Sequence, residues 1–165
     1  MLRWLLFFPC VLLAAPTYFS IGGGAFDLLR DKWRTWQFDA EIKFGLKPVN
    51  RYLTLQPVLG GFVNAHGGGY VCGGINFDLL FFDQRVLISP GFAAGYYWKG
   101  SWKDLGYPLE FRSGIELAWQ FSDWRRLGVH FYHLSNASIG RKNPGEEALV
   151  FYYDIPIKKG FPFND

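Results

Sequence analysis

Apolar and polar residues alternate along most of the chain, in short segments separated by turn residues. In the segment 36–44, every second residue is apolar: Trp36, Phe38, Ala40, Ile42 and Phe44. The residues between them are polar or charged. The segment 109–121 repeats the pattern, and Ser113 is the one interruption of its apolar face. A period of two predicts β-strands that have one apolar and one polar face.

Eight segments of this kind follow one another, and their lengths cluster near the ~10 residues that a membrane-crossing strand needs. They are Tyr18–Asp27, Trp36–Leu46, Leu53–Ala65, Gly69–Leu80, Val86–Trp98, Pro108–Phe121, Leu127–Ser135 and Glu147–Ile157. No segment has a helical period. We therefore predict an all-β fold, an eight-stranded antiparallel transmembrane β-barrel formed by residues 16–165.

Alternation alone does not say which face lies inside, and a soluble lipid-binding barrel would place the apolar face inward. Three features favour the membrane, and the third is the N-terminal export signal described in the next paragraph. Tryptophans lie at or near the predicted strand ends, as in an interfacial belt: Trp36, Trp98, Trp102, Trp119 and Trp124. Glycines on the polar face suit the narrow interior of an eight-stranded barrel. The connections after odd-numbered strands are then predicted to face outward.

The N-terminus resembles a secretory signal peptide over residues 1–15. Arg3 provides a short positive region, an apolar stretch follows, and small residues precede a cleavage site near Ala15. An uncleaved anchor is the alternative. Cys10 lies inside this segment, so Cys72 is the one cysteine of the mature chain and no intrachain disulfide is expected. The net charge of +3 is too small to indicate nucleic acid as a partner.

Three residues near the C-terminus have the chemistry of an esterase. His133 and Ser135 are two apart on a predicted strand and therefore share a face, about 7 Å apart along it. Glu147 shares the lipid-facing side of the next strand, whereas Glu146 shares the polar side. If Ser135 lies opposite Glu147, then His133 and Glu147 are diagonal neighbours within reach of each other. This register is an assumption, and a bulge would favour Glu146 instead.

The segment His133-Leu-Ser-Asn-Ala-Ser138, followed by Asn143-Pro-Gly-Glu-Glu147, resembles the outer-membrane lipid A 3-O-deacylase family of PagL type. The last strand, Phe151–Ile157, is similar as well. The glutamate comes fourteen residues after the histidine, as in the family. The family usually has glycine where this chain has Ser138.

The resemblance implies an ester hydrolase of lipid A in the outer membrane of a Gram-negative bacterium. It implies Ser135 as the nucleophile, His133 as the general base and Glu147 as the residue that orients His133. Asn136, with the backbone amides around Ala137 and Ser138, would bind the oxyanion. The expected partners are lipid A, within lipopolysaccharide, and the surrounding outer-membrane lipids, and no metal or organic cofactor is required.

Two alternatives stay open. The chain could be a catalytically silent structural barrel, in which the His-x-Ser pair is only a solvated rim. It could also be a soluble lipid-binding barrel with an apolar interior. Whether the protein acts alone or as a homodimer stays open as well. Arg141 and Lys142 could meet lipid A phosphates, but ordinary solvated loop charges are the simpler interpretation, because both ends of the predicted barrel carry basic residues.

Overall fold

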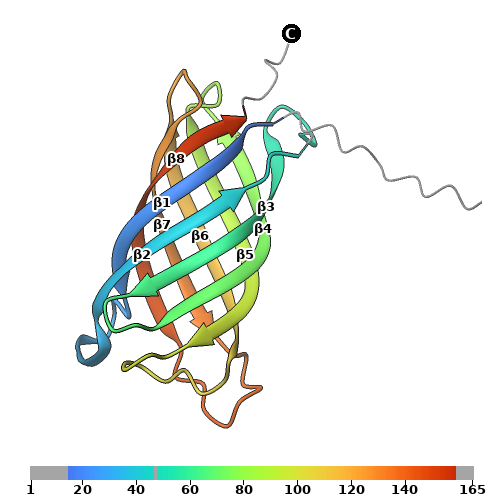
Figure 1. The fold of residues 1–165 in the computed structure, drawn as a ribbon. Helices are drawn as coiled ribbons and strands as arrows, with labels where there is room; N and C mark the ends of the chain where they lie inside the picture. The colour runs from blue at the N-terminus through green and yellow to red at the C-terminus, as the bar shows by residue number, and fades with distance from the viewer. Residues whose placement is uncertain (1–14, 47, 159–165) are drawn as a thin grey trace, which may run out of the picture.

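The computed structural model describes residues 15–46 and 48–158, and almost all of the predicted signal peptide lies outside these residues. Eight strands and one short 3-10 helix follow in the order β1 (Thr17–Phe26), η1 (Asp31–Trp33), β2 (Thr35–Lys43), β3 (Leu53–Asn64), β4 (Gly69–Phe81), β5 (Val86–Trp98), β6 (Leu109–Gln120), β7 (Arg126–Ser135) and β8 (Glu146–Lys158). Each strand pairs antiparallel with the next, and β1 pairs with β8 to close the barrel (Figure 1).

The predicted eight-stranded antiparallel barrel is confirmed, and the strand ends differ from prediction by a few residues at most. The largest difference is at the end of β2, which stops at Lys43 instead of Leu46. There the backbone N–H of Gly45 donates to Thr17 Oγ1 at 3.2 Å. A side chain at Gly45 would collide with the backbone of Ala15. The chain therefore leaves the ladder to pass close to the start of β1.

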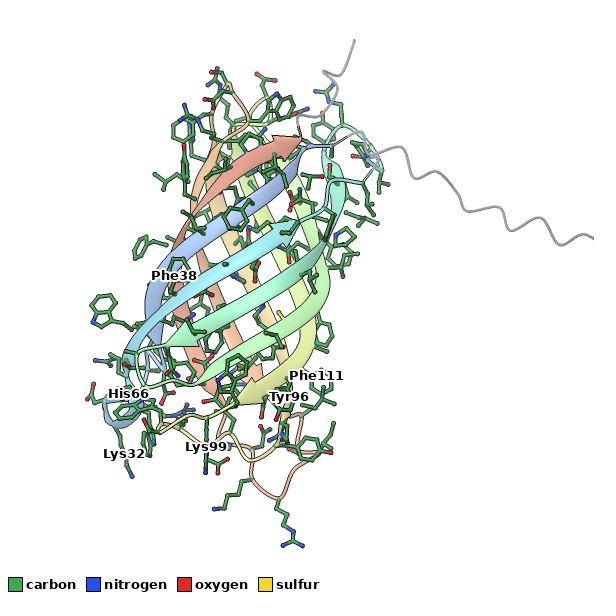
Figure 2. The ribbon with its side chains drawn as sticks, viewed as in Figure 1. Lys32, Phe38, His66, Tyr96, Lys99 and Phe111 are labelled. Atoms are coloured by element: carbon green, nitrogen blue, oxygen red, sulfur yellow. The ribbon has the colours of Figure 1, made fainter. Side chains whose placement is uncertain are left out.

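The outer wall of the barrel is apolar. The outward side chains of the strands include large exposed hydrophobic residues on every side of the barrel, among them Phe38, Leu59, Val71, Leu117, Leu127 and Phe151. Figure 2 shows Phe38, Tyr96 and Phe111 on this wall. This arrangement is the reverse of a soluble lipid-binding barrel, which has its apolar face inside.

The interior is filled by charged and polar side chains, several of which form ion pairs with one another. Lys43 Nζ lies 2.8 Å from Glu116 Oε2 and 3.3 Å from Asp154, and all three side chains are buried. Arg126 donates to Asp78 Oδ2 at 2.7 Å. Buried charges require such partners, because removal from water is otherwise costly. The alternation along the strands therefore places polar and charged side chains inside the barrel and apolar side chains on its outer wall.

The two ends of the barrel differ. The connections after β1, β3, β5 and β7 form what we call the loop end, at the bottom of Figure 1, and the other connections form the turn end. At the loop end the interior is closed by an apolar cluster that includes Phe26, Tyr97, Leu105 and Leu134. No helix among the described residues is long and apolar enough to cross a membrane.

Aromatic contacts join three connections of the loop end. His66, which follows β3, stacks on Trp102 from the β5–β6 connection, with ring centroids 3.5 Å apart and nearly parallel planes. Trp102 also meets Trp33 edge to face at 5.3 Å and donates from Nε1 to the Trp33 carbonyl at 2.6 Å. The connections after β1, β3 and β5 are thus held together as one surface.

Candidate active site

His133 and Glu147 are joined at the loop end of β7 and β8. His133 Nδ1 lies 3.1 Å from Glu147 Oε1, within hydrogen-bond distance. The His133 side chain is 43% exposed and the Glu147 side chain 15%. With Nδ1 engaged by the carboxylate, the ring is oriented and its Nε2 atom is left for a substrate-side contact.

The register between β7 and β8 differs from the one assumed from sequence. His133 pairs directly with Glu147, and Leu134 pairs with Glu146. The assumption that Ser135 lies opposite Glu147 was therefore wrong by two residues. The strands separate after Leu134, since residues 136–145 form a wide loop rather than a tight hairpin. A shift by two preserves the alternation of faces, so Glu147 still lies on the same side as His133.

Glu146 lies on the opposite face of β8. Its side chain is fully buried, and Oε2 accepts the backbone N–H of Asp27 at 3.1 Å. The structure therefore brings Glu147, and not Glu146, to the imidazole.

Ser135 ends β7, two residues beyond His133 on the same outward face, and is half-buried. Among the described residues, its hydroxyl has no hydrogen bond to the His133 ring. Such contacts are often loose without substrate. A second outward hydroxyl, on Ser113, lies directly across from His133 on β6 and is exposed. Two serines thus flank the imidazole, one along its strand and one across from it.

Asn136 follows Ser135 but turns its side chain inward, where it is fully buried. Its Nδ2 donates to the carbonyls of Leu105 at 2.9 Å and Lys142 at 2.8 Å. Its backbone N–H donates to Asn143 Oδ1 at 3.1 Å. These three hydrogen bonds tie Asn136 to the β5–β6 connection and to the β7–β8 loop, and they hold that loop in place.

Ala137 and Ser138 come next and are exposed. Both have positive φ angles, 52° and 63°, a conformation that costs energy for residues with a side chain. The loop folds back at this point, and the backbone N–H of Ile139 donates to the Asn136 carbonyl at 3.0 Å. Successive left-handed residues beside a serine form a tight turn whose backbone amides can point at an anion.

Gly145 supports the other edge of the imidazole. Its φ is +58°, and a Cβ atom built there would lie 2.7 Å from His133 Cε1 and 3.4 Å from Nε2. Only a glycine leaves room for the ring in this position. The imidazole is therefore placed between the Glu147 carboxylate and the Gly145 backbone.

The sequence reasoning missed a charged group that reaches this site from the β1–β2 connection. Arg30 Nη1 lies 3.3 Å from Glu147 Oε2. It also donates to Asp27 Oδ1 at 2.9 Å and to the Gly145 carbonyl at 3.1 Å. The closure of the barrel could have indicated it, because β1 pairs with β8 and so the first connection lies beside the last. No local motif marks Arg30.

The β5–β6 connection completes the support. Lys103 Nζ donates to the buried Asp27 Oδ1 at 2.7 Å. Asp104 accepts the Gly106 backbone N–H at 2.9 Å, and this hydrogen bond, with a second from Lys99, holds the pKa of the Asp104 carboxyl below its usual value. The turn places the Leu105 carbonyl against Asn136.

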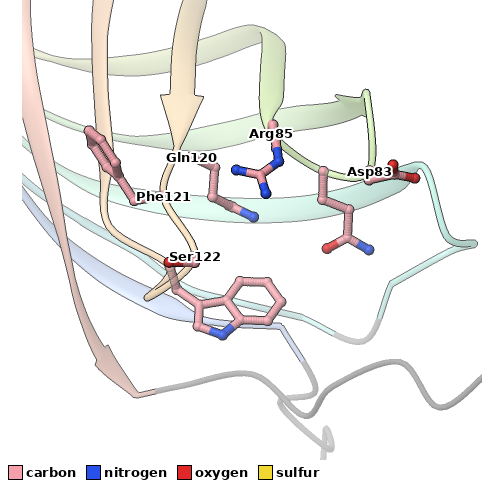
Figure 3. A pocket seen from close by; sticks show the side chains of 7 residues that line it. Asp83, Arg85, Gln120, Phe121 and Ser122 are labelled. Atoms are coloured by element: carbon pink, nitrogen blue, oxygen red, sulfur yellow. The ribbon is translucent and has the colours of Figure 1, made fainter.

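Two cavities lie away from these residues. A pocket of about 300 Å³ at the turn end is lined by residues of two turns, including Asp83, Arg85 and Gln120 (Figure 3). An apolar groove of about 500 Å³ crosses the outer wall over β2 to β5. Neither lining contains a histidine. Neither cavity is lined by His133, Ser135 or Glu147.

The remaining candidates from the sequence are possible metal ligands, the basic residues of the last loop, and His66. Among residues 15–46 and 48–158, no cluster of three or more histidine, cysteine, aspartate or glutamate side chains is arranged to hold a metal ion. Arg141 and Lys142 are exposed. Figure 2 shows His66 at the loop end, and its ring stacks on Trp102 as described above.

Comparison with known proteins identifies the fold and the family of the chain. No curated protein sequence matches the chain. A solved structure described as the outer membrane enzyme PagL has the same fold, with a TM-score of 0.69 and 21% sequence identity, and the match covers 85% of this chain and 99% of that one. The family model described as "Lipid A 3-O-deacylase (PagL)" matches residues 16–156. The chain therefore belongs to the lipid A 3-O-deacylase (PagL) family.

Proposed function

We propose that this protein is an outer-membrane serine esterase that removes the ester-linked 3-O-acyl chain of lipid A. In this proposal Ser135 is the nucleophile, His133 the general base and Glu147 the residue that orients His133. The observation that carries the proposal is the 3.1 Å contact between His133 Nδ1 and Glu147 Oε1, on the outward stripe that ends in Ser135. Membership of the deacylase family supports the choice of substrate.

The outer wall supports a membrane location. Large apolar side chains are exposed around the barrel, and charged side chains such as Lys43 and Glu116 are buried and paired inside it. In water this wall would be a continuous apolar surface far larger than soluble monomers expose. In the proposal the loop end faces the cell exterior, as expected when both chain ends face the periplasm. The site then lies beside the outer leaflet, which contains lipid A.

The first chemical step is acyl transfer to the serine. His133 Nε2 removes the Ser135 hydroxyl proton while Oγ attacks the ester carbonyl carbon, and a C–O bond forms. The Glu147 carboxylate accepts a hydrogen bond from the Nδ1–H group of His133 and thereby stabilises the imidazolium. The proton stays on Nδ1. The carbonyl oxygen becomes an oxyanion, and backbone amides of the Ala137–Ser138 turn are the proposed donors, held in place by Asn136.

The intermediate then collapses. The bond to the sugar oxygen breaks, and His133 returns its proton to that oxygen, so that the sugar leaves with a free 3-hydroxyl. Water, deprotonated by His133, attacks the acyl-serine, and the free fatty acid and the original Ser135 hydroxyl are released. The half-exposed imidazole allows water to reach this position.

The proposal is tested by lipid A analysis of cells that produce the wild-type protein or Ser135→Ala. Ser113→Ala is the matched control, because Ser113 is also an outward hydroxyl beside His133. Loss of one 3-O-acyl mass with the wild type and with Ser113→Ala, but not with Ser135→Ala, is the expected result. An unchanged lipid A in all three, with folded protein in the outer membrane, would favour the silent structural barrel.

A further inference from the structure

The Glu147 carboxylate has two oxygens, and His133 uses one of them. The other, Oε2, lies 3.3 Å from Arg30 Nη1. A carboxylate held at one oxygen can still rotate about its terminal torsion, which is broad and roughly two-fold. Contacts at both oxygens from different directions restrict that rotation. The contact of Arg30 with Oε2 therefore helps to keep Oε1 oriented toward His133 Nδ1.

Arg30 is itself held by neighbours on two sides. Its Nη1 contacts Asp27 Oδ1 at 2.9 Å and the Gly145 carbonyl at 3.1 Å, and its backbone N–H donates to the Asp27 carbonyl at 3.1 Å. Asp27 is fully buried and is paired with Lys103 at 2.7 Å. The guanidinium is planar and always charged, so these contacts keep it aimed at the carboxylate.

The same group of contacts couples the first loop to the last. The Leu28 backbone N–H donates to the Glu147 carbonyl at 2.7 Å, and the Asp27 N–H donates to Glu146 Oε2 at 3.1 Å. Arg30 also touches the carbonyl of Gly145, the residue whose backbone lies against the His133 ring. One arginine therefore contacts both elements that determine the position of the imidazole.

We propose that Arg30 is a positioning residue for the catalytic pair, acting through Glu147 and not through the substrate. The proposal rests on the proposed roles of His133 and Glu147. A direct role in binding a lipid A phosphate is the competing interpretation. The geometry favours positioning, because the charge of Arg30 already faces two carboxylates, Asp27 and Glu147.

The test uses the purified, folded full-length protein and lipid A in mixed micelles. Arg30→Met removes the charge but keeps much of the side-chain length. Arg34→Met is the matched control: Arg34 lies in the same connection with 46% of its side chain exposed, against 43% for Arg30, and its contacts are with Asp31 and the Leu28 carbonyl. Arg30→Lys has the positive charge that Arg30→Met lacks, but it does not have the planar guanidinium group.

We expect Arg30→Met to lower kcat about tenfold, as for loss of one close ion-pair contact to the orienting carboxylate, and to change KM less than about twofold. Arg34→Met should behave as wild type, and Arg30→Lys should recover part of kcat. In a Glu147→Gln background, Arg30→Met should have no further effect, because the residue through which it acts is already altered.

Three results with Arg30→Met would overturn the inference. The first is full activity of Arg30→Met. The second is a rise in KM with kcat unchanged, which indicates substrate binding. The third is an effect of the same size in the Glu147→Gln background. If Arg30→Met fails to fold, Arg30→Lys decides, and kcat and KM equal to the wild-type values in that variant overturn the inference. An inactive wild-type protein would instead overturn the proposed function, and the inference with it.

Discussion

His133 and Glu147 face each other directly across the β7–β8 pair, and their side chains meet at 3.1 Å between Nδ1 and Oε1. The neighbouring Glu146 points into the barrel and accepts a backbone N–H of Asp27. Two adjacent carboxylates of the same type therefore occupy opposite faces of one strand, and only one of them reaches the imidazole.

This difference predicts opposite outcomes for two matched variants. Glu147→Gln should lower kcat on the order of 10³-fold, because the amide no longer stabilises the imidazolium or its working tautomer. Glu146→Gln keeps an oxygen acceptor for the Asp27 N–H and should retain kcat within about twofold. Steady-state kinetics on folded protein compares them. A larger loss in Glu146→Gln than in Glu147→Gln would show that the acid has been misassigned.

Gly145 provides a second comparison. Gly145→Ala would place a Cβ 2.7 Å from His133 Cε1 and should lower kcat by about tenfold or more, since small displacements of a catalytic group are costly. Gly67→Ala is the control, because Gly67 also has positive φ, +74°, but a Cβ there meets nothing within 4 Å. Both variants carry similar backbone strain. Equal kcat in the two would mean that contact with the ring is unimportant.

The β7–β8 loop depends on Asn136. Asn136→Asp removes both Nδ2 donors and turns a carboxylate toward the Leu105 and Lys142 carbonyls. The buried repulsion should displace the loop, which lowers kcat by about tenfold or more and makes the loop easier to cleave. Limited proteolysis of the folded barrel, with kcat from the same preparation, is the measurement. Wild-type resistance together with wild-type kcat would contradict the supporting role.

The charged interior predicts an effect on stability without an effect on chemistry. Lys43→Met leaves Glu116 and Asp154 buried without their cation and should destabilise the barrel by about 3–5 kcal/mol. Lys99→Met breaks an exposed pair with Asp104 and should cost about 0–1 kcal/mol. Denaturant unfolding followed by gel mobility compares them. Similar midpoints for the two variants would indicate that the interior pairs add nothing.

The strands could be predicted from sequence because outward and inward residues alternate so strictly, as at Trp36–Lys43. The face of Glu147 followed from the same parity. The register between β7 and β8 could not be predicted in this way. It depends on the ten-residue loop 136–145, whose shape is determined by buried contacts of Asn136 with Leu105 and Lys142. The family resemblance implied an oxyanion role for Asn136, and alternation alone does not reveal that its side-chain amide donates to two carbonyls inside the barrel.

Arg30 illustrates a different limit. It lies 117 positions before Glu147 in the sequence, and no spacing rule connects the two. Only the pairing of β1 with β8, together with the anchoring of Asp27 by Lys103, brings the guanidinium to the carboxylate. Long-range closure of a barrel therefore adds site residues that local motifs do not contain.

The most direct measurement is the mass spectrum of lipid A from Gram-negative cells that produce the wild-type protein, Ser135→Ala or Ser113→Ala, with each protein verified as folded in the outer membrane. We expect loss of one 3-O-acyl chain with the wild type and Ser113→Ala, and intact lipid A with Ser135→Ala. Deacylated lipid A with Ser135→Ala, or intact lipid A with the wild type, would contradict it.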